Sequence, residues 1–148
     1  MNGRLQLSEF VTRLDTALNV IPNTVHVATV YRRDYLNAFA KTLPAVWVAA
    51  QRLSRLDDGY GTSGLFRQKL KVDVAIRLVV QRYANGIVEN EAELNDLHDL
   101  VSNTIIGWRP TGADKPMAFE SSTDGPAHES VSSADVIFFT HCTYEASV

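Results

Sequence analysis

The sequence predicts one α+β domain spanning residues 1–148, with two main helices packed on one face of a mixed or antiparallel sheet of about four to five strands. Three observations indicate this fold class. A chain of 148 residues that is 45% hydrophobic can bury one core of ordinary domain size. Two segments repeat apolar residues at helical spacing. Other segments alternate apolar and polar residues, as strands with one buried face do.

The first element is an amphipathic helix close to the N-terminus. Ser8 is its expected N-cap, and Pro22 follows the point where the pattern fades. Its predicted core-facing stripe consists of Leu7, Phe10, Val11, Leu14 and Leu18. β-Branched and apolar residues then predict strands over residues 24–30 and 44–51, with a short helix over residues 34–41 between them.

The segment DDGYGTSG, residues 57–64, predicts an exposed loop between strands. It contains three glycines and shows no apolar periodicity. Such a loop can become ordered when a partner binds, so it is the candidate docking loop, with Asp57, Asp58, Tyr60 and Gly61 as its contact residues.

The strongest signal is a long alternating strand, FRQKLKVDVAIRLVVQ, with one face in the core and one in water. A turn at Asn85 and Gly86 follows it. A second helix is expected from about Asn90 to Gly107, with acidic residues in its first turns where the helix dipole favours them.

The C-terminal third predicts two more strands. A short strand is expected around residues 117–119, and residues 121–133 should form an exposed loop or a wide hairpin. The final strand, residues 134–145, is apolar on both faces, because Ile137 and Phe139 alternate with Val136 and Phe138. A second apolar face needs cover from another helix layer or from a neighbouring subunit.

No motif in the sequence predicts catalysis, a metal site or a cofactor. His141 and Cys142 are adjacent in a strand, so their side chains point to opposite faces and cannot act as a base and nucleophile pair. The glycine-bearing loop has no phosphate-binding lysine, and the acidic residues around His98 do not share a helix face well. An active site assembled from separated residues remains an alternative.

Charge and cysteine content restrict the partners and the setting. The net charge of -3 argues against general or sequence-specific nucleic-acid binding, and the single cysteine suits a reducing cytoplasm. The chain lacks a signal peptide pattern and an apolar run long enough to span a bilayer, so we expect neither export by that route nor a membrane partner.

The basic residues suggest an assembly surface. Four of them lie at or near the polar face of the long strand, where they could meet acidic groups of a neighbouring subunit. With the apolar pair of the last strand, they make up the predicted subunit interface: Arg67, Lys69, Lys71, Arg77, Ile137 and Phe139.

From residue 44 to 148 the chain resembles the tail terminator family of long-tailed bacteriophages, especially the Mu-type branch, and more distantly the lambda tail terminator. The resemblance is carried by the FRQKLKVDVAIRLVVQ strand, the Asn85-Gly86 turn, the helix ELNDLHDLVSNTIIGW followed by Arg109 and Pro110, and the last strand ADVIFFTHCTYEAS. Trp108 and Pro110 are expected to be structural, with Trp108 packing the end of the helix and Pro110 stopping it.

The resemblance implies a virion structural protein, assembled in the host cytoplasm, that closes into a ring, a hexamer in this family. The ring would end tail tube polymerisation at the head-proximal end and offer a docking face for the head connector. Its partners would be other copies of itself, the tail tube protein and the connector or stopper protein, and DNA would pass through its lumen.

Two alternatives stay open. The chain could be a head-tail connector or stopper protein, which has a similar small format. It could also be a small-ligand-binding domain or an enzyme with a dispersed site, in which case the outer face of Ile137 and Phe139 would line a pocket.

Overall fold

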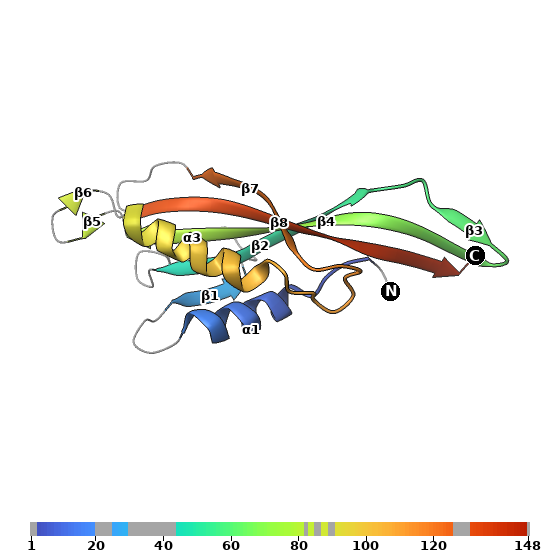
Figure 1. Cartoon of the computed structure of the whole chain (residues 1–148), viewed down its shortest axis with the longest axis horizontal. Helices are drawn as coiled ribbons and strands as arrows, with labels where there is room; N and C mark the ends of the chain where they lie inside the picture. Colours follow the sequence, from blue (N-terminus) through green and yellow to red (C-terminus); the bar gives the residue numbers. More distant parts are fainter. Residues whose placement is uncertain are drawn as a thin grey trace.

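The computed structural model describes residues 3–19, 25–29, 44–81, 83–84, 87–88, 91–125 and 131–147. The elements in these ranges form an elongated molecule with long central strands and two helices near one end (Figure 1). In chain order they are α1 (Leu7–Leu18), β1 (His26–Thr29), β2 (Ala45–Arg55), β3 (Tyr60–Thr62), β4 (Leu65–Gln81), β5 (Tyr83–Ala84), β6 (Ile87–Val88), α3 (Glu91–Ile105), β7 (Ala118–Asp124) and β8 (Val131–Ser147).

The main sheet is mixed and has six strands, slightly more than the four to five predicted. Its order is β1-β2-β4-β8-β7, and β3 also pairs with β4. The β1–β2 pair is parallel, and the other pairs are antiparallel. The short strands β5 and β6 pair separately with each other. The predicted α+β class is therefore confirmed.

The centre of the sheet is one uninterrupted ladder between β4 and β8. It runs from Leu65 opposite Ser147 to Gln81 opposite Val131. Alternate side chains in the body of this ladder are buried, as the sequence pattern predicts for a sheet with one core face. The buried residues of the ladder on this face are Val72, Val74, Ile76, Leu78, Val80, Ala134, Val136, Phe138, Thr140 and Cys142.

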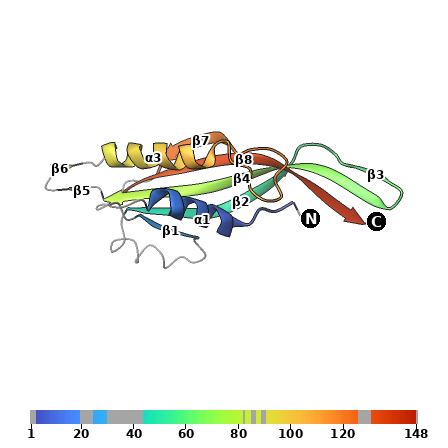
Figure 2. The same cartoon turned by 60° about the horizontal axis from the view of Figure 1, so that its bottom comes forward.

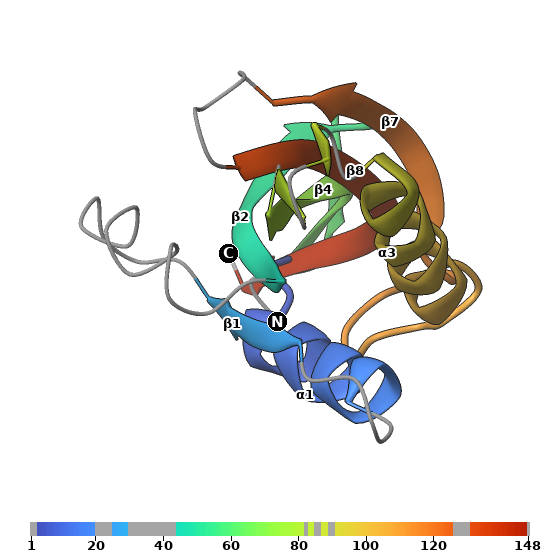
Figure 3. The same ribbon diagram turned by 90° about the vertical axis from the view of Figure 1, so that its left-hand side faces the viewer.

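Both helices cover this same face of the curved sheet (Figure 3). α1 contributes Phe10, Leu14 and Leu18 to the core, as its predicted stripe requires. α3 contributes Leu94, Leu97, Val101 and Ile105. α3 stops where Gly107 adopts a φ of 86°, a conformation that glycine reaches without a steric penalty.

The strands continue past the helices as an arm (Figure 2). We define the arm as residues 54–55 of β2, all of β3, residues 65–71 of β4 and residues 141–147 of β8. Its inner face is covered by the N-terminal segment, because a Cβ on Gly3 would lie 2.7 Å from the Leu70 side chain. Gln51 fixes this segment: its Nε2 donates to the Leu5 carbonyl at 2.9 Å, and its Oε1 accepts from the Leu5 N–H at 3.0 Å.

Several local predictions were wrong. The N-cap of α1 is Gln6, not Ser8, since the helix already starts at Leu7. The segment 57–64 is not wholly a loop, because β3 lies inside it and pairs with β4 across a turn at Ser63 and Gly64, which both have positive φ. Residues 121–124 belong to β7, and residues 131–133 to β8. These strand ends are polar on both faces, so they lack the alternation of apolar and polar residues by which a strand is recognised in a sequence.

The helix predicted over residues 34–41 and the turn at Asn85 and Gly86 lie outside the described residues.

Candidate functional site

The outer face of the main sheet, opposite the helices, carries most of the residues predicted for a subunit interface. Arg77 pairs with Asp135 directly across the β4–β8 ladder. Its Nε donates to Oδ1 at 2.7 Å, and a terminal nitrogen donates to Oδ2 at 3.0 Å. The planar guanidinium matches the carboxylate at two points, which fixes both side chains.

Lys71 occupies the centre of a second ionic group on this face. Its Nζ lies 2.6 Å from Glu120 Oε1 and 3.5 Å from Asp73 Oδ1. The hydrogen bond to Glu120 is the main cause that raises the pKa of Lys71, while partial burial opposes the shift. Glu120 sits where the β7–β8 register shifts, between Phe119 and Ser121. No pattern in the sequence indicated that Glu120 would join this face.

Phe139 lies half-buried between two lysines. The Nζ of Lys71 is 5.0 Å from the ring centroid and that of Lys115 is 5.6 Å away, within the range of cation–π attraction. Ile137, also half-buried, lies two residues away on the same face, opposite Ala75. Lys115 comes from the turn before β7, a segment without periodicity, so sequence reasoning missed it.

At the arm, Arg67 pairs with Glu145 at 3.1 Å. These two residues line a hollow of about 340 Å³ together with Tyr60, Lys69 and Asp114. Three of the four predicted interface cations, Arg67, Lys71 and Arg77, therefore have acidic partners within their own chain. A role in contacts between subunits stays a prediction for these cations, for Lys69, and for Ile137 and Phe139.

The predicted docking loop is a structured hairpin at the end of the arm. Asp57 Oδ1 accepts hydrogen bonds from the backbone N–H groups of Gly59 and Lys69, at 2.9 Å and 3.1 Å. Asp58 pairs with Arg55 in solvent. Tyr60, 60% exposed, and Gly61 are open to a partner. Asp57 thus shapes the hairpin, and Tyr60 and Gly61 are exposed and could contact a partner.

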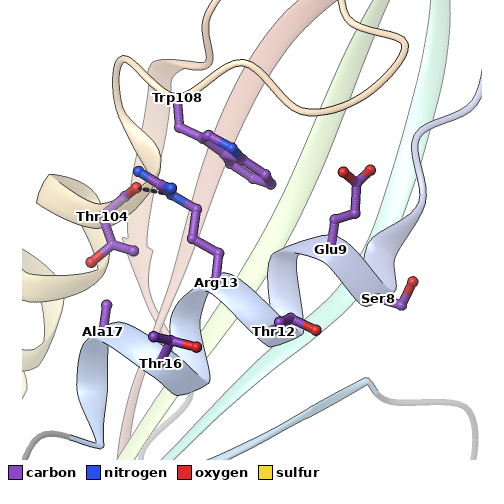
Figure 4. Close-up of a pocket in the computed structure, with 8 residues that line it drawn as sticks. All are labelled: Ser8, Glu9, Thr12, Arg13, Thr16, Ala17, Thr104 and Trp108. Atoms are coloured by element: carbon purple, nitrogen blue, oxygen red, sulfur yellow. Dashed lines mark hydrogen bonds between the residues drawn. The ribbon is translucent and has the colours of Figure 1, made fainter.

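A groove of about 610 Å³ lies between α1 and the end of α3 (Figure 4). Arg13 crosses it: its Nε donates to the Thr104 carbonyl at 2.8 Å, and its guanidinium carbon is 4.9 Å from the centroid of the Trp108 ring. Glu9 accepts a hydrogen bond from the Thr111 hydroxyl at 2.8 Å. Both charged groups of the groove are therefore engaged in contacts that connect α1 to the segment after α3.

Trp108 and Pro110 lie in that segment. The Trp108 ring packs edge-on against buried Phe10, with centroids 4.9 Å apart, and Pro110 is buried. α3 ends before both residues, at Ile105. Pro110 is therefore too far along the chain to stop α3 as expected, since the helix has already ended before Gly107. The contact of Trp108 with Phe10 is compatible with the packing role expected for Trp108.

The remaining chemical candidates are isolated. Burial raises the pKa of the Cys142 thiol to about 11, so the thiol stays protonated and unreactive. His98 contacts the Ser122 hydroxyl through Nε2 at 3.0 Å. Across the described ranges, no group of three His, Cys, Asp or Glu side chains could hold a metal ion. No helix in the described part of the chain is long and apolar enough to cross a membrane.

Comparison with known proteins gives two positive results. Among solved structures, 36 chains match this fold. One of them is a chain from the "Virion of native gene transfer agent (GTA) particle", with a TM-score of 0.54 and 12% sequence identity, covering 90% of this chain and 84% of that chain. At this identity the likeness shows the fold alone. No curated protein matches significantly.

The model of one family, described as phage tail terminator protein, matches residues 2–145. This is nearly the whole chain and includes both helices, the main sheet and the arm. The chain therefore belongs to the phage tail terminator family and is a structural component of a phage tail.

Proposed function

We propose that this protein closes into a ring on the head-proximal end of the tail tube, where it ends tube polymerisation and provides the docking face for the head connector. The family match over residues 2–145 carries this proposal. Its fold is also similar to that of a chain from a virion particle. The role needs self-association and contact surfaces, and no catalytic residue.

The outer sheet face fits a role in subunit packing. It bears half-buried Ile137 and Phe139 within a frame of paired charges. Charges held in fixed intrachain pairs keep their positions, so they can direct a partner's approach and set its orientation. Among the residues that the structure describes, both helices cover the opposite face, which supports a neighbouring subunit on this one.

Native mass spectrometry and negative-stain imaging test the proposal. The purified protein, alone or mixed with tail tube protein, is expected to form rings of one size, six subunits if it follows the family resemblance. Tube protein that polymerises alone should give tubes of variable length, and addition of this protein should stop growth and place a ring on one tube end. A chain that stays monomeric with tubes present, and leaves their growth unchanged, would contradict the proposal.

The same experiment separates a terminator from a connector or stopper protein. A terminator binds bare tube ends before any connector is added. A stopper protein would leave bare tubes unbound and would bind only once another neck component is present.

A further inference from the structure

The main sheet has an open edge at β7. β7 is the last strand in the order, and β8 is its single strand neighbour within the described ranges. The N–H of Gly125 donates to the Ser133 carbonyl at 2.8 Å, which continues the β7–β8 ladder. Because backbone groups alternate in direction along an antiparallel ladder, the N–H and C=O groups of Ser122 and Asp124 point away from β8. Both residues are exposed, so these groups are available to another strand.

The opposite edge of the sheet is β1. It pairs in parallel with β2 from His26 to Thr29, and β2 is its single strand neighbour in the part of the chain that the structure describes. Viewed along the strands, the sheet is curved, and β7 and β1 lie at its two margins (Figure 3). One chain therefore presents a different edge strand at each margin.

The two edge strands lie at the same level of the sheet. Residue pairing can be followed from β1 through β2, β4 and β8 to β7. One row consists of Val27, Val46, Leu78, Ala134 and Asp124, and another consists of Thr29, Val48, Ile76, Val136 and Ser122. The register shifts of the β2–β4 and β7–β8 pairs lie outside these rows. Rotation about an axis parallel to the strands therefore brings β7 of one copy beside β1 of the next without sliding either strand.

Strand direction and the direction of the side chains also match. β1 is parallel to β2, and three antiparallel pairs separate β2 from β7, so β1 and β7 run in opposite directions. A contact between them is antiparallel, the more stable arrangement. In both rows the residues of β2, β4 and β8 belong to the buried core, so the paired edge residues share the helix-covered face. A slip of one residue would break this match.

Exposed apolar side chains lie beside the β7 edge. Phe119 in β7 and Ile106 after the end of α3 are each 46% exposed. The two segments adjoin, because the Gly107 N–H donates to the Met117 carbonyl at 2.9 Å. A subunit that docks at this margin therefore covers apolar surface as well as backbone groups, and burial of apolar surface favours association.

We infer that neighbouring subunits join through their sheets, with β7 of one copy antiparallel to β1 of the next, Ser122 opposite Thr29 and Asp124 opposite Val27. This inference rests on the proposed ring and identifies a joint that builds it, separate from the contact on the outer face. The joint connects two different surfaces of the chain. Repetition about one axis therefore closes a ring and leaves neither edge open to further pairing.

Paired cysteine variants test the joint. Thr29→Cys and Ser122→Cys place thiols on the two facing strands, where the Cβ atoms of paired residues are about 4.5–5.5 Å apart. Dibromobimane, which joins only closely spaced thiols, should give a covalent dimer in rings that contain both variants, and almost none in rings of either variant alone. The unmodified chain, whose Cys142 is buried, is the blank.

The matched control combines Thr29→Cys with Thr123→Cys. Thr123 is the neighbour of Ser122 in β7, but its side chain points to the other face of the sheet. This mixture should therefore crosslink poorly. Efficient crosslinking of Thr123→Cys in place of Ser122→Cys would contradict the register of the joint.

Proline at the edge gives a second test. Ser122→Pro removes an N–H that points away from β8, so the β7–β8 ladder is kept while pairing with a further strand is blocked. The protein concentration needed for half-maximal ring formation should rise at least tenfold. Ser122→Ala removes only the hydroxyl that contacts His98, so this matched control should form rings as the unmodified chain does. Thermal melting checks that both variants are folded.

The outcomes distinguish this inference from the proposed function. Rings that form normally on tube ends, without the crosslink between Thr29→Cys and Ser122→Cys, would overturn the joint and leave the terminator role intact. A crosslink from Ser122→Cys to tube protein in its place would also overturn the joint, by making the β7 edge the tube-binding surface. Absence of rings under all conditions would overturn both.

Discussion

Arg77 and Asp135 face each other across the two central strands and form a two-point ion pair, with N–O distances of 2.7 Å and 3.0 Å. Their side chains are 33% and 37% exposed. Arg55 and Asp58 also form an ion pair, at 3.2 Å, but their side chains are 71% and 91% exposed. The chain thus contains a fixed pair and a solvated pair that can be compared directly.

We predict that Asp135→Asn destabilises the fold by about 1 kcal/mol, because a partly shielded, two-point pair contributes near the upper end of the range for surface ion pairs. Asp58→Asn should leave stability unchanged within error, because water screens that pair. Urea denaturation of both variants, followed by circular dichroism, measures the difference. Equal effects would mean that the geometry of the Arg77 pair adds nothing to stability.

Phe139→Asp is predicted to impair assembly and to spare the fold. The side chain is half-buried on the outer face, and Lys71 and Lys115 lie close enough to accommodate a new carboxylate. Loss of the aromatic side chain should raise the protein concentration needed for half-maximal assembly by about tenfold, which corresponds to about 1.4 kcal/mol. Native mass spectrometry checks assembly, and thermal melting checks the fold.

Leu100→Asp is the matched control for Phe139→Asp. Leu100 is 52% exposed on α3, on the opposite side of the molecule from the proposed subunit contact. This variant should assemble as the unmodified chain does. If Phe139→Asp unfolds the protein, the Phe139 side chain belongs to the intramolecular core, and its placement in the subunit interface is wrong.

Gln51→Leu is predicted to release the N-terminal segment from the arm. The leucine side chain cannot replace the two hydrogen bonds that hold the Leu5 backbone. Two such bonds are together worth about 1 to 3 kcal/mol. Hydrogen exchange at residues 3–6 should accelerate. Gln6→Leu, at an exposed residue without a side-chain cap bond, should leave exchange unchanged.

Cys142 should report unfolding through its reactivity. Its thiol is 1% exposed, and its pKa rises from 9.0 to about 11, mainly through burial. That shift lowers the thiolate fraction at neutral pH about a hundredfold. Labelling by a thiol reagent in native buffer should therefore be very slow, and it should become fast at the urea concentration that unfolds the sheet. Rapid labelling in native buffer would contradict the buried position.

We predict that protonation of His141 lowers the free energy of unfolding in mild acid. Burial, together with the nearby Lys115, lowers its pKa from the ordinary value of 6.5. Between 6.5 and the lower folded value, the unfolded chain binds more protons than the folded chain, so stability decreases as pH falls through this window. In His141→Gln this part of the decrease should disappear from urea midpoints measured between pH 7 and pH 5. An unchanged pH profile would refute the assignment.

Local patterns predicted much of the fold. The apolar stripe of α1, the acidic start of α3 and the alternation in β4 were readable because helix and strand periods are properties of the nearby chain. The strand ends and the β3 hairpin were not predicted. Those segments are polar and short, and it is pairing with β4 that makes them strands.

The sequence by itself determined that this is a one-core α+β chain with a wet face on β4 and apolar residues on both faces of β8, and it contained the pattern that resembles tail terminators. Only the tertiary structure decided that β4 and β8 pair over 17 residues each and project as an arm, and that Arg67, Lys71 and Arg77 find acidic partners in their own chain. The physical reason is register. Side chains such as Arg77 and Asp135 are 58 residues apart, and only the pairing of whole strands brings them together.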